Sequence, residues 1–177
     1  MSETLPSRET ALRLLKKSGC SRNVIQHCKN VSKLAVKIAK ILQKKGYAVD
    51  LRLVETGALL HDIGRSKTHS VHHAIVGAEI ARSFALPEPI VRIIERHVGA
   101  GIPKEEAKVL GWPEKSYMPE TLEEKIVTYA DKLVEGTKRV DIEQTIAKTS
   151  GKLGKRHPAN ARLRTIQKEF ESLLGEF

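Results

Sequence analysis

Apolar residues recur at steps of three and four along nearly the whole chain, and stretches that alternate apolar and polar residues are almost absent. One such row contains Val24, His27, Cys28, Val31, Leu34, Ala35, Ile38 and Leu42. This spacing is typical of the buried face of an amphipathic helix. The sequence therefore predicts an all-α fold, organised as a single bundle of about seven to eight helices with a functional site in its centre.

Helix start and stop residues divide the chain in a regular way. Ser7 and Ser21 are predicted N-caps, and the long helix after Ser21 is expected to stop at Gly46. Asp50 is expected to open the next helix, and Pro87 to begin a later one. We expect an N-terminal helix over 1–20, a main domain over 21–136 and a helical extension over 137–177 packed on that domain.

The C-terminal part contains three further predicted helices. Thr121 and Glu124 form a capping-box pattern for a helix that we expect to end at Gly136. Two more helices are expected over 141–150 and 158–174. The glycine- and lysine-rich stretch 151–156 lacks the spacing of a phosphate loop, so we interpret it as an exposed basic turn.

The pair His61-Asp62 ends an apolar run and is followed closely by Gly64. Neighbouring helical residues point about 100° apart, but both side chains can still converge on an ion in a groove between helices. A carboxylate beside an imidazole suits Zn, Mn, Fe or Mg better than a metal that prefers thiolates.

Four further polar residues, His27, His73, His97 and Asp131, lie on apolar helix faces. A single histidine in such a place is more often a core histidine with a hydrogen-bond partner than a ligand. Aspartate, however, is rarely buried unless it is paired or binds a metal. Together with His61-Asp62, these residues favour a metal site in the centre of the bundle.

Two other histidines, His69 and His72, lie close to His73, and either could replace it as a ligand. His73 is favoured because it lies four residues before Gly77, where a small residue allows close helix packing. His72 is expected to face solvent or substrate.

The order His27, His61-Asp62, Asp131 resembles the HD superfamily of metal-dependent phosphohydrolases. Residues 61–64 are similar to the H-D-I-G variant of its signature. His73 with Gly77 resembles the H-x-x-x-G helix start of the two-metal branch, and His97 resembles that branch's next ligand. The resemblance covers about residues 20 to 136, and the chain as a whole is similar to small archaeal HDIG proteins of unassigned substrate.

The resemblance implies one or two divalent ions, with Mn, Fe, Co, Ni, Zn and Mg all compatible. The implied ligands are His27, His61, Asp62 and Asp131 for the first ion, and Asp62, His73 and His97 for the second. Asp62 would bridge the two ions, and a bridging hydroxide would be the nucleophile. Bound metals lower the pKa of water and neutralise charge on phosphoryl oxygens.

Besides Asp62, the resemblance assigns catalytic roles on the phosphate side to Arg65 and Lys132. Many H-D-I-G sequences continue with lysine, and Arg65 keeps the charge while adding bidentate reach to phosphate. Lys132 could instead pair with Glu135 or Glu124. Lys67 is a third cation that could meet a substrate phosphate, or it could simply be solvated. The chain lacks the Gly-Tyr-Pro signature of the branch that degrades cyclic-di-GMP.

The net charge of +10 attracts polyanions, either nucleotides or nucleic acid. Aromatic residues make up only 4% of the chain, and no nucleic-acid-binding module is found, which favours a small phosphorylated substrate, such as a nucleotide, over RNA. No apolar run is long enough for a membrane helix, and no signal peptide is evident. Cys20 and Cys28 are expected to be free thiols in a reducing cytoplasm. The oligomeric state is left open.

The long segment 100–120 connects the helix of His97 to the helix of Asp131. Long loops in compact domains are often functional. One hypothesis is a lid in which Trp112 and Tyr117 stack on a base, and the other is that both aromatic residues only fix the loop to the core.

These patterns predict a metal-dependent phosphohydrolase that acts on a phosphomonoester or phosphodiester of a nucleotide or a related small phosphate compound. Two alternatives stay open: a non-catalytic sensor that binds a nucleotide or metal, and an RNA-processing nuclease similar to the HD domain of ribonuclease Y.

Overall fold

The structure is a computed structural model that describes residues 4–175. Its helices are α1 (Arg8–Ser18), α2 (Arg22–Lys44), α3 (Leu51–Leu60), α4 (His73–Ser83), α5 (Glu88–Arg96), α6 (Lys104–Val109), α7 (Leu122–Lys132), α8 (Ile142–Leu153) and α9 (Pro158–Leu174). Two short 3₁₀ turns, η1 (Ile63–Ser66) and η2 (Val98–Ala100), follow α3 and α5. The all-α prediction is confirmed, although the described residues form nine α-helices, slightly more than the seven to eight expected.

The predicted N-caps are present with the expected hydrogen bonds. The hydroxyls of Ser7 and Ser21 each accept a bond from a backbone N–H three residues later. The Asp50 carboxylate caps α3 in the same way. Thr121 and Glu124 form the complete capping box at the start of α7. Four helix starts are therefore fixed by local side-chain chemistry.

Two predicted helix ends were wrong. The helix of Asp131 ends at Lys132, and the chain then forms a small antiparallel hairpin of β1 (Val134–Glu135) and β2 (Lys138–Arg139). Gly136, with a φ of 57°, allows the tight turn between the two strands. Helix α8 continues to Leu153, so the first half of the expected basic turn 151–156 is helical and only Gly154 ends the helix.

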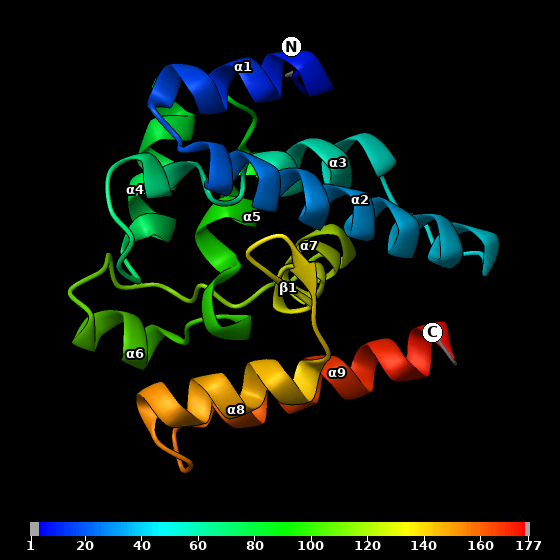
Figure 1. Ribbon diagram of the computed structural model, residues 1–177, viewed down its shortest axis with the longest axis vertical. Coiled ribbons are helices and arrows are strands. Elements are labelled where there is room, and N and C mark those ends of the chain that lie inside the picture. Colours follow the sequence, from blue (N-terminus) through cyan, green and yellow to red (C-terminus); the bar gives the residue numbers. More distant parts are fainter. Residues whose placement is uncertain (1–3, 176–177) are drawn as a thin grey trace.

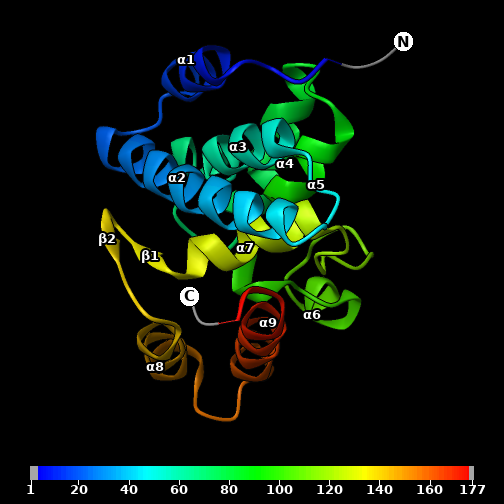
Figure 2. The ribbon, with the colours of Figure 1, turned by 90° about the vertical axis from the view of Figure 1, so that its right-hand side faces the viewer.

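Helices α2, α3, α5 and α7 lie at the middle of the molecule, with α1 at one end and the α8–α9 pair at the other (Figures 1 and 2). One apolar cluster joins α2 and α7 to α9, whose Leu163, Ile166 and Phe170 are buried in it. A second cluster joins α1, α3, α4 and α5. The division into segments 1–20, 21–136 and 137–177 stays a prediction, and residues 1–3 and 176–177 lie outside the described residues.

The segment 100–120 is fixed to the bundle by its aromatic residues. Trp112 and Tyr117 are only 5% and 1% exposed, and both pack near Ala74 of α4 in a small cluster of their own. The Tyr117 hydroxyl donates to the carbonyl of Pro113. Base stacking by these two residues was therefore the wrong hypothesis, because neither ring face is open to a ligand.

Helix α4 lies unusually close to the turn that follows α3. A Cβ atom added at Gly64 would overlap the carbonyl oxygen of His73 and would lie 2.7 Å from the backbone nitrogen of Gly77. A Cβ atom at Gly77 would in turn lie 2.8 Å from Cγ2 of Ile94. The two glycines therefore permit a backbone-to-backbone contact that no other residue type allows.

In the part of the chain that the structure describes, every helix is too short or too polar to span a lipid bilayer.

Substitution of Gly64 by alanine is expected to destabilise the protein by about 3 kcal/mol, the upper part of the range for overpacked sites. The added methyl group meets backbone atoms, which cannot move aside as a flexible side chain can. Urea unfolding followed by circular dichroism measures the change. Gly151→Ala is the matched control, because Gly151 lies in α8 with no atom near its added Cβ. It should stabilise the helix by up to about 1 kcal/mol, and equal stabilities of the two variants would contradict the close packing.

Both cysteines are free and buried, and burial raises the pKa of each thiol, that of Cys20 to about 11. Because the thiolate is the reactive form, we expect alkylation by iodoacetamide at pH 8 to be at least about tenfold slower in the native protein than in urea.

Between about pH 9 and 11 the unfolded chain loses thiol protons that the folded chain keeps, so the free energy of unfolding should fall across this range. Unfolding curves at several pH values measure this change, and mass spectrometry measures the alkylation rates. Equal alkylation rates in the native and unfolded states would refute the burial of the thiols.

Candidate metal centre

The six predicted ligands come from five places in the chain and meet in the middle of the bundle. His27 lies on α2, His73 begins α4, and Asp131 lies in the last turn of α7. His61 and His97 are the residues directly after α3 and α5, and Asp62 follows His61. Helix ends therefore supply most of the site.

The carboxylate of Asp62 is the link between two groups of histidines. Its Oδ2 atom lies 3.6 Å from Nε2 of His27 and 3.5 Å from Nε2 of His61. Its Oδ1 atom lies 3.1 Å from Nε2 of His73 and 3.3 Å from Nε2 of His97. Each oxygen of one buried carboxylate thus faces a separate pair of imidazole nitrogens.

Asp131 completes the first of these groups. Its Oδ1 atom lies 3.0 Å from Nε2 of His27 and 3.3 Å from Nε2 of His61. The candidate ligand atoms of His27, His61 and Asp131 all lie within 4.8 Å of one another, as do those of His61, Asp62 and His97. Two overlapping sets of metal-binding donors therefore share His61.

All four imidazoles use Nδ1 in the same way, as a neighbour of a backbone carbonyl oxygen. The distances are 2.8 Å for His27 to Gly136, 2.6 Å for His61 to Ala58, 2.7 Å for His73 to Ser70 and 2.7 Å for His97 to Ile94. Since a carbonyl oxygen can only accept, Nδ1 must carry the hydrogen. In the neutral rings Nε2 therefore has a free lone pair.

This arrangement leaves donor atoms that fit a divalent cation. Nε2 of His73 and Nε2 of His97 lie 3.0 Å apart, so two lone pairs face each other when both rings are neutral. His61 Nε2 and Asp62 Oδ1 are buried without a hydrogen-bond partner among the described residues. Metal–nitrogen bonds of about 2.0–2.1 Å bring ligand atoms to separations of about 3 Å. The donor set and its spacing therefore suit a metal centre, while the identity of the metal is not determined.

Electrostatics keep most of the donors in the ionisation state that metals need. Burial acts to raise the pKa of Asp62, but the charge of His61 and the close imidazoles of His73 and His97 outweigh it and hold this pKa well below its usual value. Burial also acts to raise the pKa of Asp131. The positive charge of Lys132 is the main effect that opposes it, and the pKa of Asp131 is held well below its usual value.

The histidines differ from one another. Burial lowers the pKa of His97 to about 4, so that ring is neutral at pH 7. Burial also acts to lower the pKa of His61, but the negative charge of Asp62 outweighs it, and the pKa of His61 is raised well above its usual value. A metal that binds to His61 would therefore displace a proton.

The predicted phosphate-side cations lie at the edge of the cluster. Arg65 Nε donates to Asp62 Oδ2 over 3.1 Å, and its side chain is 30% exposed. Lys132 Nζ donates to Asp131 Oδ2 over 2.7 Å, rather than pairing with Glu124 or Glu135. Lys67 is exposed.

The other two histidines near His73 lie outside the cluster. His72 is exposed, and its Nδ1 atom accepts a hydrogen bond from Trp112 Nε1. His69 is exposed, and its carbonyl oxygen accepts from Arg65. Of the three candidates, the structure therefore brings His73 to the other donors.

Two supporting contacts were missed by the sequence analysis. The carbonyl of Gly136, in the turn of the β1–β2 hairpin, orients His27. The buried Arg96 donates to Glu124 and to the carbonyl of Met118, which connects the end of α5 to the start of α7. Glu124 had been noticed for its capping role and as a possible partner of Lys132, and the arginine next to His97 on a buried helix end could have suggested this pair.

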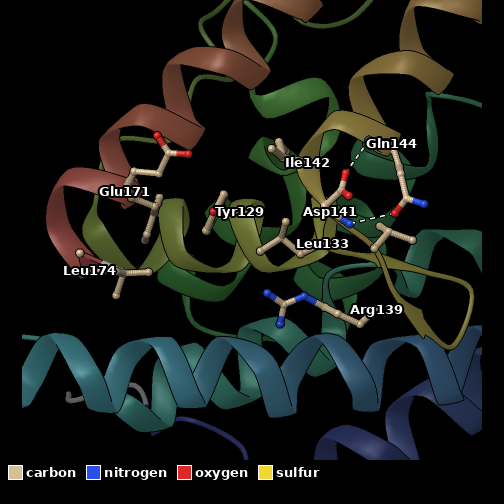
Figure 3. Close-up of a pocket in the computed structure, with 11 residues that line it drawn as sticks. Tyr129, Leu133, Arg139, Asp141, Ile142, Gln144, Glu171 and Leu174 are labelled. Carbon is tan, nitrogen blue, oxygen red and sulfur yellow. Dashed lines mark hydrogen bonds between the residues drawn. The ribbon is translucent and has the colours of Figure 1, made fainter. Parts of the chain in front are cut away.

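A large cavity lies away from this cluster. It has a volume of about 930 Å³ and lies between α7, α8 and α9 (Figure 3), where Tyr129 and Phe170 stack at one side. None of the six clustered residues lines it. The metal-binding chemistry, rather than cavity size, identifies the candidate site.

Comparison with known proteins agrees with this geometry. Residues 24–136 match the HD domain family. An uncharacterized protein of Methanocaldococcus jannaschii is 52% identical over 94% of this chain and 98% of its own length. The tRNA (cytidine(56)-2'-O)-methyltransferase of Picrophilus torridus is 42% identical over 97% of this chain, which spans only 48% of that protein. The ribonuclease Y of Acidothermus cellulolyticus is 39% identical over 48% of this chain, and the match covers 17% of the enzyme.

Among solved structures, the HD domain of the Listeria monocytogenes phosphodiesterase PgpH has the same fold. Superposition of the two chains gives a TM-score of 0.52 at 20% sequence identity, and the match covers 93% of this chain and 96% of the Listeria domain. A second structure of that domain contains cyclic-di-AMP and gives a TM-score of 0.51.

Substitution of His97 by alanine is expected to remove one bound ion per chain and to leave part of the other. His97 faces only the Oδ1 side of Asp62, whereas His27, His61 and Asp131 remain for the first ion. The protein is saturated with Mn²⁺, unbound metal is removed by gel filtration, and the bound metal is then measured by inductively coupled plasma mass spectrometry. His69→Ala is the matched control and should bind as the wild type does, and the same loss in both variants would contradict the assignment.

Proposed function

The chain belongs to the HD domain family, and we propose that it is a metal-dependent phosphohydrolase acting on a nucleotide or a related small phosphate compound. The observation that carries this proposal is the position of Asp62, whose two oxygens face separate pairs of imidazole nitrogens. A carboxylate in this position can bridge two ions, with His27, His61 and Asp131 on one side and His73 and His97 on the other.

The proposed chemistry follows from what such a site supplies. Bound divalent ions would lower the pKa of a water molecule and neutralise the negative charge of phosphoryl oxygens. Asp62 and Asp131 provide the negative charge that retains the cations. The Nδ1–H bonds of the histidines keep their Nε2 atoms directed at the centre without help from substrate.

The exposure of the cluster indicates the side from which a substrate arrives. The side chains of His61 and His97 are at most 2% exposed, whereas those of His27, Asp131 and Lys132 are 13–15% exposed. Arg65, at 30%, is more open still. The open side of the site is therefore bordered by two cations, and an anionic phosphate group fits there.

RNA is the second candidate substrate. Relatives of this chain include proteins named ribonuclease Y and tRNA methyltransferase, and the chain carries a net charge of +10. The structural neighbour crystallised with cyclic-di-AMP adds cyclic dinucleotides to the small substrates that we would test.

The proposal is tested by incubating the wild type and Asp62→Ala with Mn²⁺ and a panel of phosphate compounds. The panel contains mononucleotides, cyclic dinucleotides, dinucleoside polyphosphates and short RNA, with products identified by mass spectrometry. Asp62→Ala should lose both metal and turnover, since it removes both oxygens that face the histidines.

Products from the wild type and from the His69→Ala control, but not from Asp62→Ala, would support the hydrolase. Full activity of Asp62→Ala would refute the mechanism. Tight nucleotide binding without any product, in protein confirmed to contain metal, would favour the sensor alternative instead.

Arg65→Ala is expected to raise KM by about 10- to 100-fold, because a charge-assisted hydrogen bond contributes about 1.5–3 kcal/mol. Arg65→Lys should restore part of this loss, since it keeps the charge but not the fork geometry. Steady-state kinetics on the substrate found above provide the values. Metal content must stay near that of the wild type in both variants, and an unchanged KM in Arg65→Ala would exclude a substrate contact.

A further inference from the structure

The entire net charge of the protein comes from one segment. Residues 10–49 contain ten lysine and arginine residues and no aspartate or glutamate. The rest of the chain contains 21 basic and 21 acidic residues, so its formal charge is zero. The value of +10 therefore describes a local feature and not a general property of the surface.

Most of this charge lies in a row along α2. The row consists of Arg22, Lys29, Lys33, Lys37, Lys40 and Lys44, and we call it the α2 basic row. At 3.6 residues per turn these positions fall within an arc of about 80°, and the part from Lys29 to Lys44 is about 22 Å long. Lys33, Lys37, Lys40 and Lys44 are exposed, and Lys29 is half-buried.

Four of the six cations of this row lack a carboxylate partner among the described residues, whereas several cations elsewhere are paired. Lys29, Lys33, Lys40 and Lys44 form no ion pair with any residue of 4–175. Elsewhere, Arg92 pairs with Glu120, and Arg162 pairs with Glu106. Like charges four residues apart destabilise a helix by about 0.2–0.5 kcal/mol per pair. The repulsion between neighbouring lysines of the row is thus a small cost to the stability of α2.

Shallow grooves border the row on both sides. One, of about 260 Å³, lies between α2 and the β1–β2 hairpin and is lined by Asn30, Lys33, Lys37 and Arg139 among others. Asn30 donates to the carbonyl of Thr137, which attaches the hairpin to α2. The other, of about 580 Å³, is bordered by Arg8 and by Lys29, Lys33 and Lys40. An extended ligand could therefore follow α2 and have walls on either side.

We propose that the α2 basic row binds a nucleic acid through its phosphodiester backbone. A row of evenly spaced cations about 22 Å long is longer than a mononucleotide and matches a polymer that carries a charge at every unit. Few aromatic residues are available to stack on bases. Binding should therefore be independent of base sequence and sensitive to salt.

An anionic membrane surface is a less suitable partner. Amphipathic helices bind membranes by inserting exposed apolar side chains next to their basic ones. Val31, Ile38 and Leu42 on the apolar side of α2 are completely buried in the core, and Val36 and Ile41 are partly buried. These buried residues belong to the core cluster that joins α2 to α7 and α9, so the apolar side of α2 cannot turn toward a lipid phase.

The inference does not depend on the proposed hydrolase, because the row lies on a different face of α2 from His27. The test is therefore carried out in EDTA, where metal-dependent turnover is absent. Fluorescence polarisation of labelled single-stranded RNA of about 20 nucleotides is measured over a series of salt concentrations. The test variant is Lys33→Gln, Lys40→Gln, Lys44→Gln, and the matched control is Lys152→Gln, Lys155→Gln, Lys168→Gln. Both remove three charges from exposed positions.

The α2 variant should bind about tenfold or more weakly at moderate salt, and its slope of log K against log salt should be smaller by about 2, since each phosphate contact contributes about 0.7 for single strands. The control should stay within about twofold of the wild type. Equal weakening of the two variants would overturn the proposal, as would the absence of RNA binding by the wild type at low salt. Binding to phosphatidylserine vesicles that is stronger than binding to RNA would likewise overturn it.

Discussion

The hydrogen bonds between histidine Nδ1 atoms and backbone carbonyl oxygens connect the fold to the site. Helices leave their last carbonyl groups without intrahelical partners, and His61 and His97 each bond to the carbonyl three residues earlier at such an end. The same bond completes the helix terminus and directs Nε2 into the centre of the bundle. The positions where α3 and α5 stop are therefore also the positions where the donor atoms must be.

The cost of this arrangement is electrostatic. Two carboxylates and several imidazoles with free lone pairs lie in a region that is almost completely buried. Asp62 and Asp131 keep their charge because cationic and hydrogen-bonding neighbours offset the burial. Nε2 of His73 and Nε2 of His97, by contrast, have nothing between them to relieve their close approach. A cation bound in the centre would relieve both problems, so we expect metal binding to stabilise the fold.

The sequence predicted those features that depend on local chemistry or on one-dimensional patterns. The caps at Ser7, Ser21 and Asp50 and the box at Thr121 are local, and the structure contains all of them. The six clustered residues were found because polar groups stood on apolar faces. Their roles as ligands, and those of Arg65 and Lys132, stay predictions.

Features that depend on tertiary contacts were not predictable in this way. The hairpin after Lys132 brings its turn carbonyl at Gly136 into contact with His27, over a hundred residues away in sequence. The packing of Trp112 and Tyr117 against Ala74 of α4 decides between the two hypotheses that the sequence left open for the loop. The concentration of charge on α2 was present in the sequence, but a single figure for net charge concealed it.

The contact between Gly64 and the start of α4 has a consequence for anyone who wishes to redesign this protein. Because backbone meets backbone there, the spacing between Asp62 and His73 is set by the main chain and is insensitive to most nearby side-chain changes. Variant libraries aimed at new substrates can therefore alter exposed positions such as Lys67 without moving this frame. Positions 64 and 77 should be kept as glycine, since they act as the fixed frame within which specificity can change.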